Sequence, residues 1–194
     1  MRMPHRPGDD PVPGTVLVMV GTDVHAFDRL LDWLERWFAG RSDEPALVVQ
    51  YGHSRTPTLP HVVAFLGHDE LQRAMAEATL VVSHGGPATI TEARRHGHLP
   101  IVVPRDPAHR EHVDNHQQLF ARRLAVAGMV RLCETEVELA DALDKGLADP
   151  SAFALGADSR AQGARAEAVA RVGQIVDDLV AQRGRRTSGR RWLR

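Results

Sequence analysis

The stretch that decides the fold is TLVVSHGGPATITEARRHGHLPIVVP, residues 79–104. Its two ends, TLVVS (79–83) and LPIVVP (99–104), are almost entirely apolar, as strands buried on both faces of a sheet should be. Between them, residues 87–97 have a helical pattern that begins with Pro87, a residue suited to the first helical position. A strand, a glycine turn, a helix and a second strand predict parallel strands joined by a right-handed crossover.

The same alternation of short apolar runs and helical patterns continues on both sides of this stretch. The other expected strands are 15–20, 46–50, 61–66 and 129–133. The other expected helices are 25–39, 69–78, 113–127, 136–148 and 157–182. One face of the first of these helices carries Phe27, Leu30, Leu31, Leu34 and Phe38. The sequence therefore predicts an α/β fold, a Rossmann-like doubly wound parallel sheet of about six strands with helices on both faces.

Composition and charge limit the classes of protein to which this chain can belong. The 194 residues suffice for one domain with a substantial core, which we place at 14–182. Apolar residues make up 43% and charged residues 25%, and the net charge of −1 gives no reason to expect a nucleic-acid partner. A single cysteine, Cys133, excludes an intramolecular disulfide and fits a reducing compartment. Without an apolar run of about 18 residues, we expect a cytosolic protein or one that lies on a membrane without crossing it.

The two ends differ in composition from the middle. Residues 1–13 contain four prolines and predict a disordered lead-in. Residues 183–194 form a basic tail with six arginines and no acidic residue. This tail is either solvated or contacts anionic lipid headgroups or an acidic partner. The apolar stripe of the predicted helix 157–182 likewise has two interpretations, a docking element for another protein or a face packed on the sheet.

The fold directs attention to the loops that follow the strands. Ligands of open α/β sheets bind beyond the carboxyl ends of the strands, near the point where the strand order reverses. The loops that lie there are 21–23, 66–68, 83–86 and 104–118.

The glycine turn after the strand 79–83 has the features of a phosphate cradle. Gly85 and Gly86 allow a sharp turn and leave no side chain between the backbone and a ligand. The amides of Ala88, Thr89 and Ile90 then point out of the helix start, where the helix dipole is positive. Such a helix end can hold a diphosphate without a lysine.

Polar side chains beside this turn suggest the rest of a nucleoside diphosphate. His84 and the Thr89 hydroxyl can donate hydrogen bonds to phosphate oxygens. The carboxylate of Glu92 lies further along the same helix and could accept bonds from both hydroxyls of a ribose. Alternatively, the glycines merely turn the chain and Glu92 is a solvated helix residue. The turn is neither a Walker loop nor a GxGxxG dinucleotide motif, because the residues of those motifs are missing.

A second candidate constellation lies on the helix predicted at 113–127. Val113, Phe120 and Leu124 share the face toward the sheet, and Gln117 falls on that face as well. A glutamine at the cleft end of a buried face should form hydrogen bonds.

The polar residues around Gln117 allow three interpretations. Asn115, His116 and Gln117 offer donors and acceptors suited to the hydroxyls of a sugar. A metal site is a second interpretation, because histidines spaced by three and four residues can share one helix face. Its ligands would be His109, His112, Asp114 and His116. The third interpretation is a polar helix start without a ligand.

Five motifs in this order resemble the donor-binding half of GT-B glycosyltransferases, specifically the C-terminal domain of glycosyltransferase family 28. They are VGTDVHAFDRL (20–30), VVQYG (48–52), VSHGGPATITEA (82–93), PIVVPR (100–105) and DNHQQLFARRL (114–124). Within that family, the chain is most similar to the small catalytic subunit of two-subunit UDP-sugar transferases. These include the enzyme that adds a GlcNAc to a dolichol diphosphate sugar and its bacterial exopolysaccharide counterparts.

The resemblance implies a role for each group of candidate residues. The donor diphosphate would be held by Gly21, Thr22, His84, Gly85, Gly86, Ala88 and Thr89. The ribose would be held by Glu92, the uracil by the backbone of Leu66, Gly67 and His68, and the donor sugar by Asn115, His116 and Gln117. Family members often have a second glycine where Ala88 stands, and the methyl group of this alanine could crowd the phosphate.

The resemblance also implies the function. We expect the donor-binding subunit of an inverting glycosyltransferase that transfers a sugar from a UDP-sugar to a lipid-linked saccharide acceptor in cell-surface polysaccharide or glycolipid synthesis. The enzyme would be peripheral at the cytoplasmic face of the plasma membrane. No cofactor or metal is expected, because the helix start neutralises the phosphates and no DxD acidic pair ends a strand.

The length of the chain implies a partner. A GT-B enzyme has two Rossmann-like halves, and this chain has room for one. The acceptor half and the general base are therefore expected from a membrane-anchored subunit, and within this chain His25 is the candidate base, followed by His68 and His84. Two alternatives remain open: a catalytically silent nucleotide-sugar-binding partner and a protein related to UDP-sugar epimerases.

Overall fold

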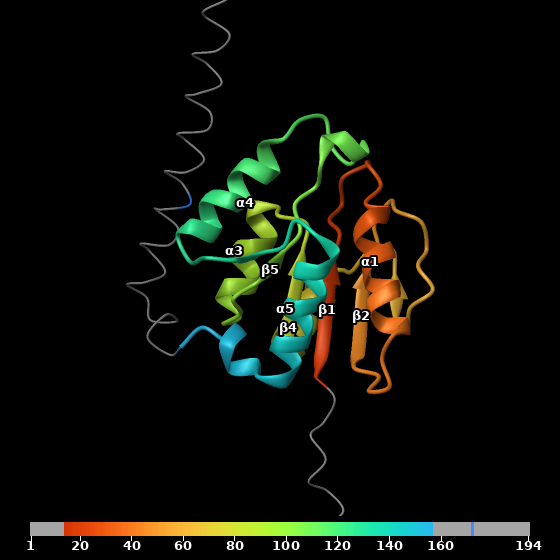
Figure 1. Cartoon of the computed structure of the whole chain (residues 1–194), viewed down its shortest axis with the longest axis vertical. Helices are drawn as coiled ribbons and strands as arrows, with labels where there is room; N and C mark the ends of the chain where they lie inside the picture. Colours follow the sequence, from red (N-terminus) through yellow and green to blue (C-terminus); the bar gives the residue numbers. More distant parts are fainter. Residues whose placement is uncertain (1–13, 157–171, 173–194) are drawn as a thin grey trace, which may run out of the picture.

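The computed structural model describes residues 14–156 and residue 172 (Figure 1). The predictions for the lead-in 1–13, for the tail 183–194 and for the helix 157–182, apart from Val172, lie outside the described residues.

The described part of the chain alternates strands and helices. The strands are β1 (Thr15–Met19), β2 (Ala46–Gln50), β3 (Val62–Val63), β4 (Leu80–Ser83), β5 (Ile101–Val102) and β6 (Arg131–Leu132). The helices are α1 (Asp28–Ala39), α2 (His68–Glu77), α3 (Pro87–Arg95), α4 (His116–Val126) and α5 (Glu136–Ala148). Two short 3-10 helices are η1 (Pro107–His109) and η2 (Pro150–Phe153).

The six strands form one parallel sheet in the order β3-β2-β1-β4-β5-β6. Strands β2 and β3 follow one another on one side of β1, and β4, β5 and β6 follow one another on its other side. The strand order therefore reverses between β1 and β4, which is where ligands of such sheets bind. The predicted doubly wound α/β fold is confirmed.

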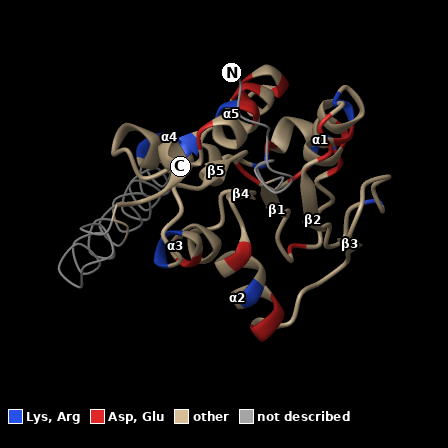
Figure 2. Cartoon of the chain, turned by 90° about the horizontal axis from the view of Figure 1, so that it is seen from below, with Lys and Arg blue, Asp and Glu red and all other residues tan. Residues whose placement is uncertain are grey.

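Helices cover both faces of the sheet (Figure 2). Side chains of α1 and α5 share one apolar cluster with Val16 and Val18 of β1. The alternate β1 residues, Leu17 and Met19, contact Met75 of α2 on the opposite face. Helix α4 packs on that second face as well, against α3 and β5. Because successive strand residues point to opposite faces, both faces of β1 are apolar and buried.

The outer strands are shorter than the apolar runs that predicted them. The runs 61–66, 99–104 and 129–133 each contribute only two ladder residues. Sheet-like hydrogen bonds nevertheless continue past these ends, from the Val103 amide to the Ser83 carbonyl (2.9 Å) and from the Cys133 amide to the Val102 carbonyl (2.8 Å). The runs therefore keep the predicted parallel direction although their ends leave the regular ladder.

Helix α1 begins at Asp28 rather than at residue 25. The amide of Phe27 donates to the Ser54 hydroxyl (2.7 Å), which holds the preceding residues outside the helix. The predicted apolar face is otherwise correct, and Trp37 is also buried on it.

Helix α4 begins at His116, three residues later than predicted. Val113 precedes the helix and is 76% exposed, so the prediction that it faces the sheet is wrong. The reason lies in the preceding loop, where Asp106 caps the short helix η1 and Arg110 adopts a left-handed conformation with φ of 61°. Phe120, Leu124 and Gln117 are buried, as predicted.

Candidate functional site

A pocket of about 410 Å³ lies at the carboxyl ends of β1 and β4, where the strand order reverses. This volume is within the range of small-molecule sites. Among the residues that the sequence predicts for the site, eight line this pocket: Gly21, Thr22, Leu66, His84, Gly86, Ala88, Thr89 and Gln117. Five further residues complete the lining: Met19, Asp23, Gln50, Leu71 and Pro87.

Six residues predicted for the site are not among the lining residues: Gly67, His68, Gly85, Glu92, Asn115 and His116. Gly67 and His68 form the start of α2, where the Gly67 amide donates to Glu70 Oε2 (2.9 Å). Asn115 and His116 form the start of α4. The roles predicted for these six residues remain predictions.

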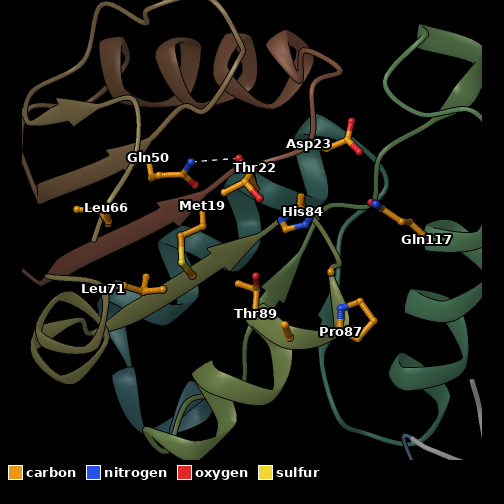
Figure 3. A pocket seen from close by; sticks show the side chains of 13 residues that line it. Met19, Thr22, Asp23, Gln50, Leu66, Leu71, His84, Pro87, Thr89 and Gln117 are labelled. Atoms are coloured by element: carbon orange, nitrogen blue, oxygen red, sulfur yellow. Dashed lines mark hydrogen bonds between the residues drawn. The ribbon is translucent and has the colours of Figure 1, made fainter. Parts of the chain in front are cut away.

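The two glycines of the turn serve different purposes. Gly85 has a φ of 91°, which side-chain-bearing residues rarely adopt. Gly86 has an ordinary φ, but a Cβ built on it would lie 2.5 Å from Nε2 of His84. A Cβ on Gly21 would meet the same ring, 2.7 Å from Cε1. The His84 ring thus lies close to the backbone of both glycines, near the middle of the pocket (Figure 3).

The imidazole of His84 is neutral at physiological pH. Burial, with a smaller contribution from the positive charge of Arg105, lowers its pKa from 6.5 to about 4. The buried Nδ1 atom has no hydrogen-bond partner among the described residues. A buried polar atom without a partner costs free energy, and a hydrogen bond from a ligand to Nδ1 would remove that cost.

The lowered pKa of His84 predicts a pH dependence of stability. Between pH 6.5 and about 4, the unfolded chain binds a proton at this histidine that the native protein does not. The free energy of unfolding should therefore fall by about 2–3 kcal/mol through this residue as the pH falls through that window. The measurement is urea unfolding of the wild type and of His84→Asn at several pH values.

The His84→Asn variant should lose this component, so its stability relative to the wild type improves as the pH falls. His53→Asn is the matched control, because His53 is exposed and this variant keeps the buried His84 and its component of the pH profile. A pH profile of His84→Asn parallel to that of the wild type would contradict a neutral, buried His84.

The start of α3 faces the pocket. Pro87 occupies the first helical position, as predicted, and Ala88 and Thr89 line the pocket. The Ile90 amide donates to the Gly86 carbonyl (3.1 Å), so the prediction that it is free for a ligand is wrong. The fourth helical residue is the first whose amide finds a partner within a helix. The amides of Ala88 and Thr89 remain to bind an anion, with the positive end of the helix dipole behind them.

Glu92 lies on α3 beyond the pocket lining. Its Oε2 accepts a hydrogen bond from Arg95 (3.0 Å), and its side chain is 24% exposed. Burial raises the pKa of Glu92, but hydrogen bonds from Gln72 and Arg95 outweigh that effect and leave the pKa below its usual value. The carboxylate is therefore ionised at neutral pH and can accept hydrogen bonds.

Gln117 reaches the pocket from α4 (Figure 3). It is only 7% exposed, and its Oε1 has no hydrogen-bond partner among the described residues. The sequence predicted a hydrogen-bonding role for a glutamine on this buried face. A ligand hydroxyl in the pocket would satisfy the amide oxygen.

The histidines before α4 come together only in part. The amide and ring of His116 both donate to the Asp114 carboxylate, and His112 Nδ1 lies 3.6 Å from the same oxygen. His112, Asp114 and His116 each offer one possible metal-ligand atom, and these three atoms lie within 4.8 Å of one another. His109 lies on η1 and is not in this group. Because Asp114 already pairs with His116, we interpret the group as the polar start of α4.

Arg105 is the main residue of the site for which the sequence predicted no role. Its side chain is fully buried, and its guanidinium donates to the carbonyls of Val20 (2.8 Å), His25 (2.6 Å) and Glu111 (3.0 Å). It thereby joins the loop after β1 to the loop after β5. A charged residue directly after an apolar strand was the available signal, because a buried charge must have partners.

Two further polar residues fix the same loops. Glu111 is 3% exposed and accepts hydrogen bonds from Arg29 Nε (2.8 Å) and from the Asp106 amide (2.8 Å). Gln50, at the end of β2, donates to the Gly21 carbonyl (3.1 Å) and to the Ala64 carbonyl (3.0 Å). The pocket walls are therefore held by side chains that form hydrogen bonds to the backbone of the loops. No helix of the described residues is long and apolar enough to cross a membrane.

Comparison with known proteins places this fold and pocket in a family. Residues 15–172 match the family model "Glycosyltransferase family 28 C-terminal domain". The chain is 30% identical over 140 residues to the UDP-N-acetylglucosamine–N-acetylmuramyl-(pentapeptide) pyrophosphoryl-undecaprenol N-acetylglucosamine transferase of Sorangium cellulosum. That alignment covers 72% of this chain but only 34% of the relative, so the chain spans about one third of the relative's length.

Solved structures show the same fold. The glycotransferase of kitacinnamycin superposes with a TM-score of 0.59 at 23% identity, over 92% of this chain and 44% of that one. MurG of Acinetobacter baumannii gives a TM-score of 0.53 at 22% identity, over 75% of this chain and 44% of that one. The family match covers most of the residues on which the sheet and the pocket are built. This chain belongs to glycosyltransferase family 28, of which it contains the C-terminal domain.

Proposed function

We propose that this chain binds the donor of an inverting glycosyltransferase and that the donor is a UDP-sugar. The observation that carries the proposal is the pocket at the strand-order reversal, where a glycine turn, a neutral histidine and the start of α3 meet. A helix start with two available amides suits a diphosphate. The positive end of the α3 dipole favours an anionic oxygen as the ligand atom there.

The other walls of the pocket suit the remaining parts of such a donor. Leu66 and Leu71 provide apolar surface for a base at one end. Gln117 provides an unpaired amide oxygen at the other, where we place the donor sugar. Glu92 is proposed for the ribose, which requires that its carboxylate exchange the Arg95 contact for sugar hydroxyls. Asn115 and His116 are proposed as further sugar contacts.

The geometry suggests how the site would promote transfer. An acceptor hydroxyl attacks the anomeric carbon from the face opposite the UDP, which inverts the configuration at that carbon. Negative charge then develops on the departing β-phosphate, beside the amides of Ala88 and Thr89. Hydrogen-bond donors that are already aligned with developing charge stabilise a transition state. We therefore propose that the start of α3 stabilises the negative charge of the departing phosphate, as a metal ion does in other transferases.

We propose that the acceptor half is supplied by a separate, membrane-associated subunit. The described residues form one Rossmann-like domain, which carries the donor pocket. The printed name of that relative includes a pyrophosphoryl-undecaprenol acceptor. A lipid-linked saccharide at the cytoplasmic face of the membrane is therefore the acceptor class that we propose here.

The Gln117 assignment predicts an asymmetry between two ligands. Gln117→Ala should leave the affinity for UDP within about twofold, while the affinity for a UDP-sugar falls by roughly fivefold to tenfold, as for one lost hydrogen bond. The measurement is calorimetric titration with UDP and with UDP-GlcNAc. Gln118→Ala, on the next position of α4, is the matched control. Equal losses for both ligands would show that Gln117 supports the pocket rather than the sugar.

The test of the proposed function is transfer from radiolabelled UDP-sugars. Membranes of the source organism, prepared after deletion of this gene, supply the acceptor and the partner subunit. We expect label in the lipid fraction only when both the purified chain and these membranes are present, because positioning of the acceptor requires the second half. Transfer by the purified chain to an extracted lipid without membrane protein would contradict the two-subunit arrangement. Binding of UDP without transfer under any condition would indicate a silent binding partner.

A further inference from the structure

The loop after β1, residues 21–27, places the carboxylate of Asp23 in the pocket lining and a histidine beside that carboxylate. Asp23 lines the pocket. Its Oδ1 accepts a hydrogen bond from the His25 amide (2.8 Å) and a second, short one from Nδ1 of the His25 ring. Two hydrogen bonds between the same pair of residues fix the ring relative to the carboxylate.

This pairing determines which ring nitrogen of His25 carries the proton. Burial raises the pKa of Asp23, but the hydrogen bonds from the His25 amide and ring outweigh it and hold the pKa below its usual value. The carboxylate is therefore ionised, so Nδ1 of a neutral His25 is the protonated nitrogen. Nε2 then carries a lone pair, and no hydrogen bond to a residue of 14–156 occupies it. The side chain is 33% exposed, which leaves it accessible to an acceptor.

The backbone that carries His25 is held on both sides. Arg105 donates to the His25 carbonyl (2.6 Å), and the Phe27 amide donates to the Ser54 hydroxyl (2.7 Å). Arg105 is fully buried and bonded to two other carbonyls as well, so its position is fixed by the core. A proton acceptor needs this kind of support, because catalytic groups act through geometry held to within fractions of an ångström.

The charged and titratable groups around His25 come from three elements. Asp23 belongs to its own loop, Arg105 follows β5, and His112 precedes α4 with its ring centre 5.8 Å from that of His25. Neither other histidine nearby is a comparable proton acceptor. His84 is buried with a pKa near 4, and burial and the neighbouring His116 lower the pKa of the largely buried His112.

We propose that Asp23 and His25 form the general-base dyad of the transfer reaction. This proposal rests on the proposed function. The acceptor hydroxyl gives its proton to Nε2 of His25, and its oxygen forms the bond to the anomeric carbon. The bond from that carbon to the β-phosphate oxygen breaks, and its electron pair leaves with UDP. Asp23 stabilises the imidazolium that results. From the sequence we expected the base on the partner subunit, with His25 as the candidate within this chain, and the dyad places the base at that candidate.

The first test compares transfer by His25→Ala, Asp23→Asn and the wild type in membranes of the source organism that lack this gene. The donors are radiolabelled UDP-glucose, UDP-galactose and UDP-GlcNAc. We expect His25→Ala to lower kcat by about 10²–10⁴-fold, the usual contribution of a general base. The donor KM and the calorimetric affinity for UDP should stay within about twofold of the wild type, since the ring bonds to the acceptor. His109→Ala, an exposed histidine on η1, is the control and should keep the wild-type rate.

The outcomes separate this proposal from the proposed function. Transfer by His25→Ala within about threefold of the wild-type rate overturns the dyad while donor binding stands. A loss of UDP affinity as large as the loss of kcat also overturns it, because His25 is then a donor ligand. A folded wild-type chain that does not bind UDP overturns the proposed function itself.

A second measurement does not depend on transfer. Nitrogen-15 NMR of the histidine rings reports which nitrogen is protonated in the neutral form. We expect the proton of His25 on Nδ1 in the wild type and a shift toward the other tautomer in Asp23→Asn, whose amide can donate to Nδ1. A neutral wild-type His25 with its proton on Nε2 would overturn the dyad, because that nitrogen could not accept a proton.

Discussion

Replacement of Arg105 by methionine should lower the free energy of unfolding by about 3–5 kcal/mol, the cost of breaking a buried network of charged hydrogen bonds. Methionine fills similar space but donates no hydrogen bond. The carbonyls of Val20, His25 and Glu111 would then lose a donor inside the protein. Because these carbonyls belong to loops on two sides of the pocket, UDP binding should weaken together with stability. Urea unfolding and calorimetric titration measure the two effects.

Arg94→Met is the matched control for this prediction. Arg94 is partly buried, and among the described residues its guanidinium donates to one carbonyl, that of Met129 (2.7 Å). Its replacement should cost only about 1 kcal/mol, the value of one hydrogen bond. If Arg105→Met costs no more than Arg94→Met, the guanidinium does not hold the pocket loops together.

Gly86→Val should abolish the stabilisation of the chain by UDP. At a UDP concentration about 100 times the dissociation constant, mass action should stabilise the wild type by about 2.7 kcal/mol. A Cβ on Gly86 would lie 2.5 Å from Nε2 of His84, so the larger valine must displace the ring and occupy the space beside the α3 start. The measurement is the thermal unfolding midpoint with and without UDP.

Gly156→Val controls for the introduction of a valine, because a Cβ at Gly156 meets no atom of the described residues within 4 Å. Its response to UDP should match that of the wild type. Should a folded Gly86→Val protein respond to UDP as the wild type does, the glycine turn is not a diphosphate cradle.

Much of this fold follows from local sequence signals. Strands such as Leu80–Ser83 are apolar on both faces, and Pro87 marks a helix start that needs no tertiary information. The start of α4 could not be found in this way. It depends on the loop 104–115, whose path is set by the pairing of Glu111 with Arg29, 82 positions earlier in the chain. Contacts between such distant residues leave no periodic pattern.

The same distinction applies to the site. The sequence could single out Gln117 as a candidate, because a polar residue on the apolar face of a helix needs a hydrogen-bond partner. This requirement is the same whether the helix starts at residue 113 or at residue 116. Asn115 and His116 could not be placed, because the helix begins three residues later than predicted, which makes Asn115 the residue before the helix and His116 its first residue. The different purposes of Gly85 and Gly86 became visible only with the position of the His84 ring.

The central claim is that the pocket between β1 and β4 binds the nucleoside diphosphate of a sugar donor. Calorimetric titration of UDP into the purified chain tests it most directly, with UMP as the comparison ligand. The structure predicts saturable binding of one UDP per chain and much weaker binding of UMP, which lacks the phosphate that would meet the amides of Ala88 and Thr89. A folded chain that shows no saturable binding of UDP, or binds UMP as tightly as UDP, would contradict the account.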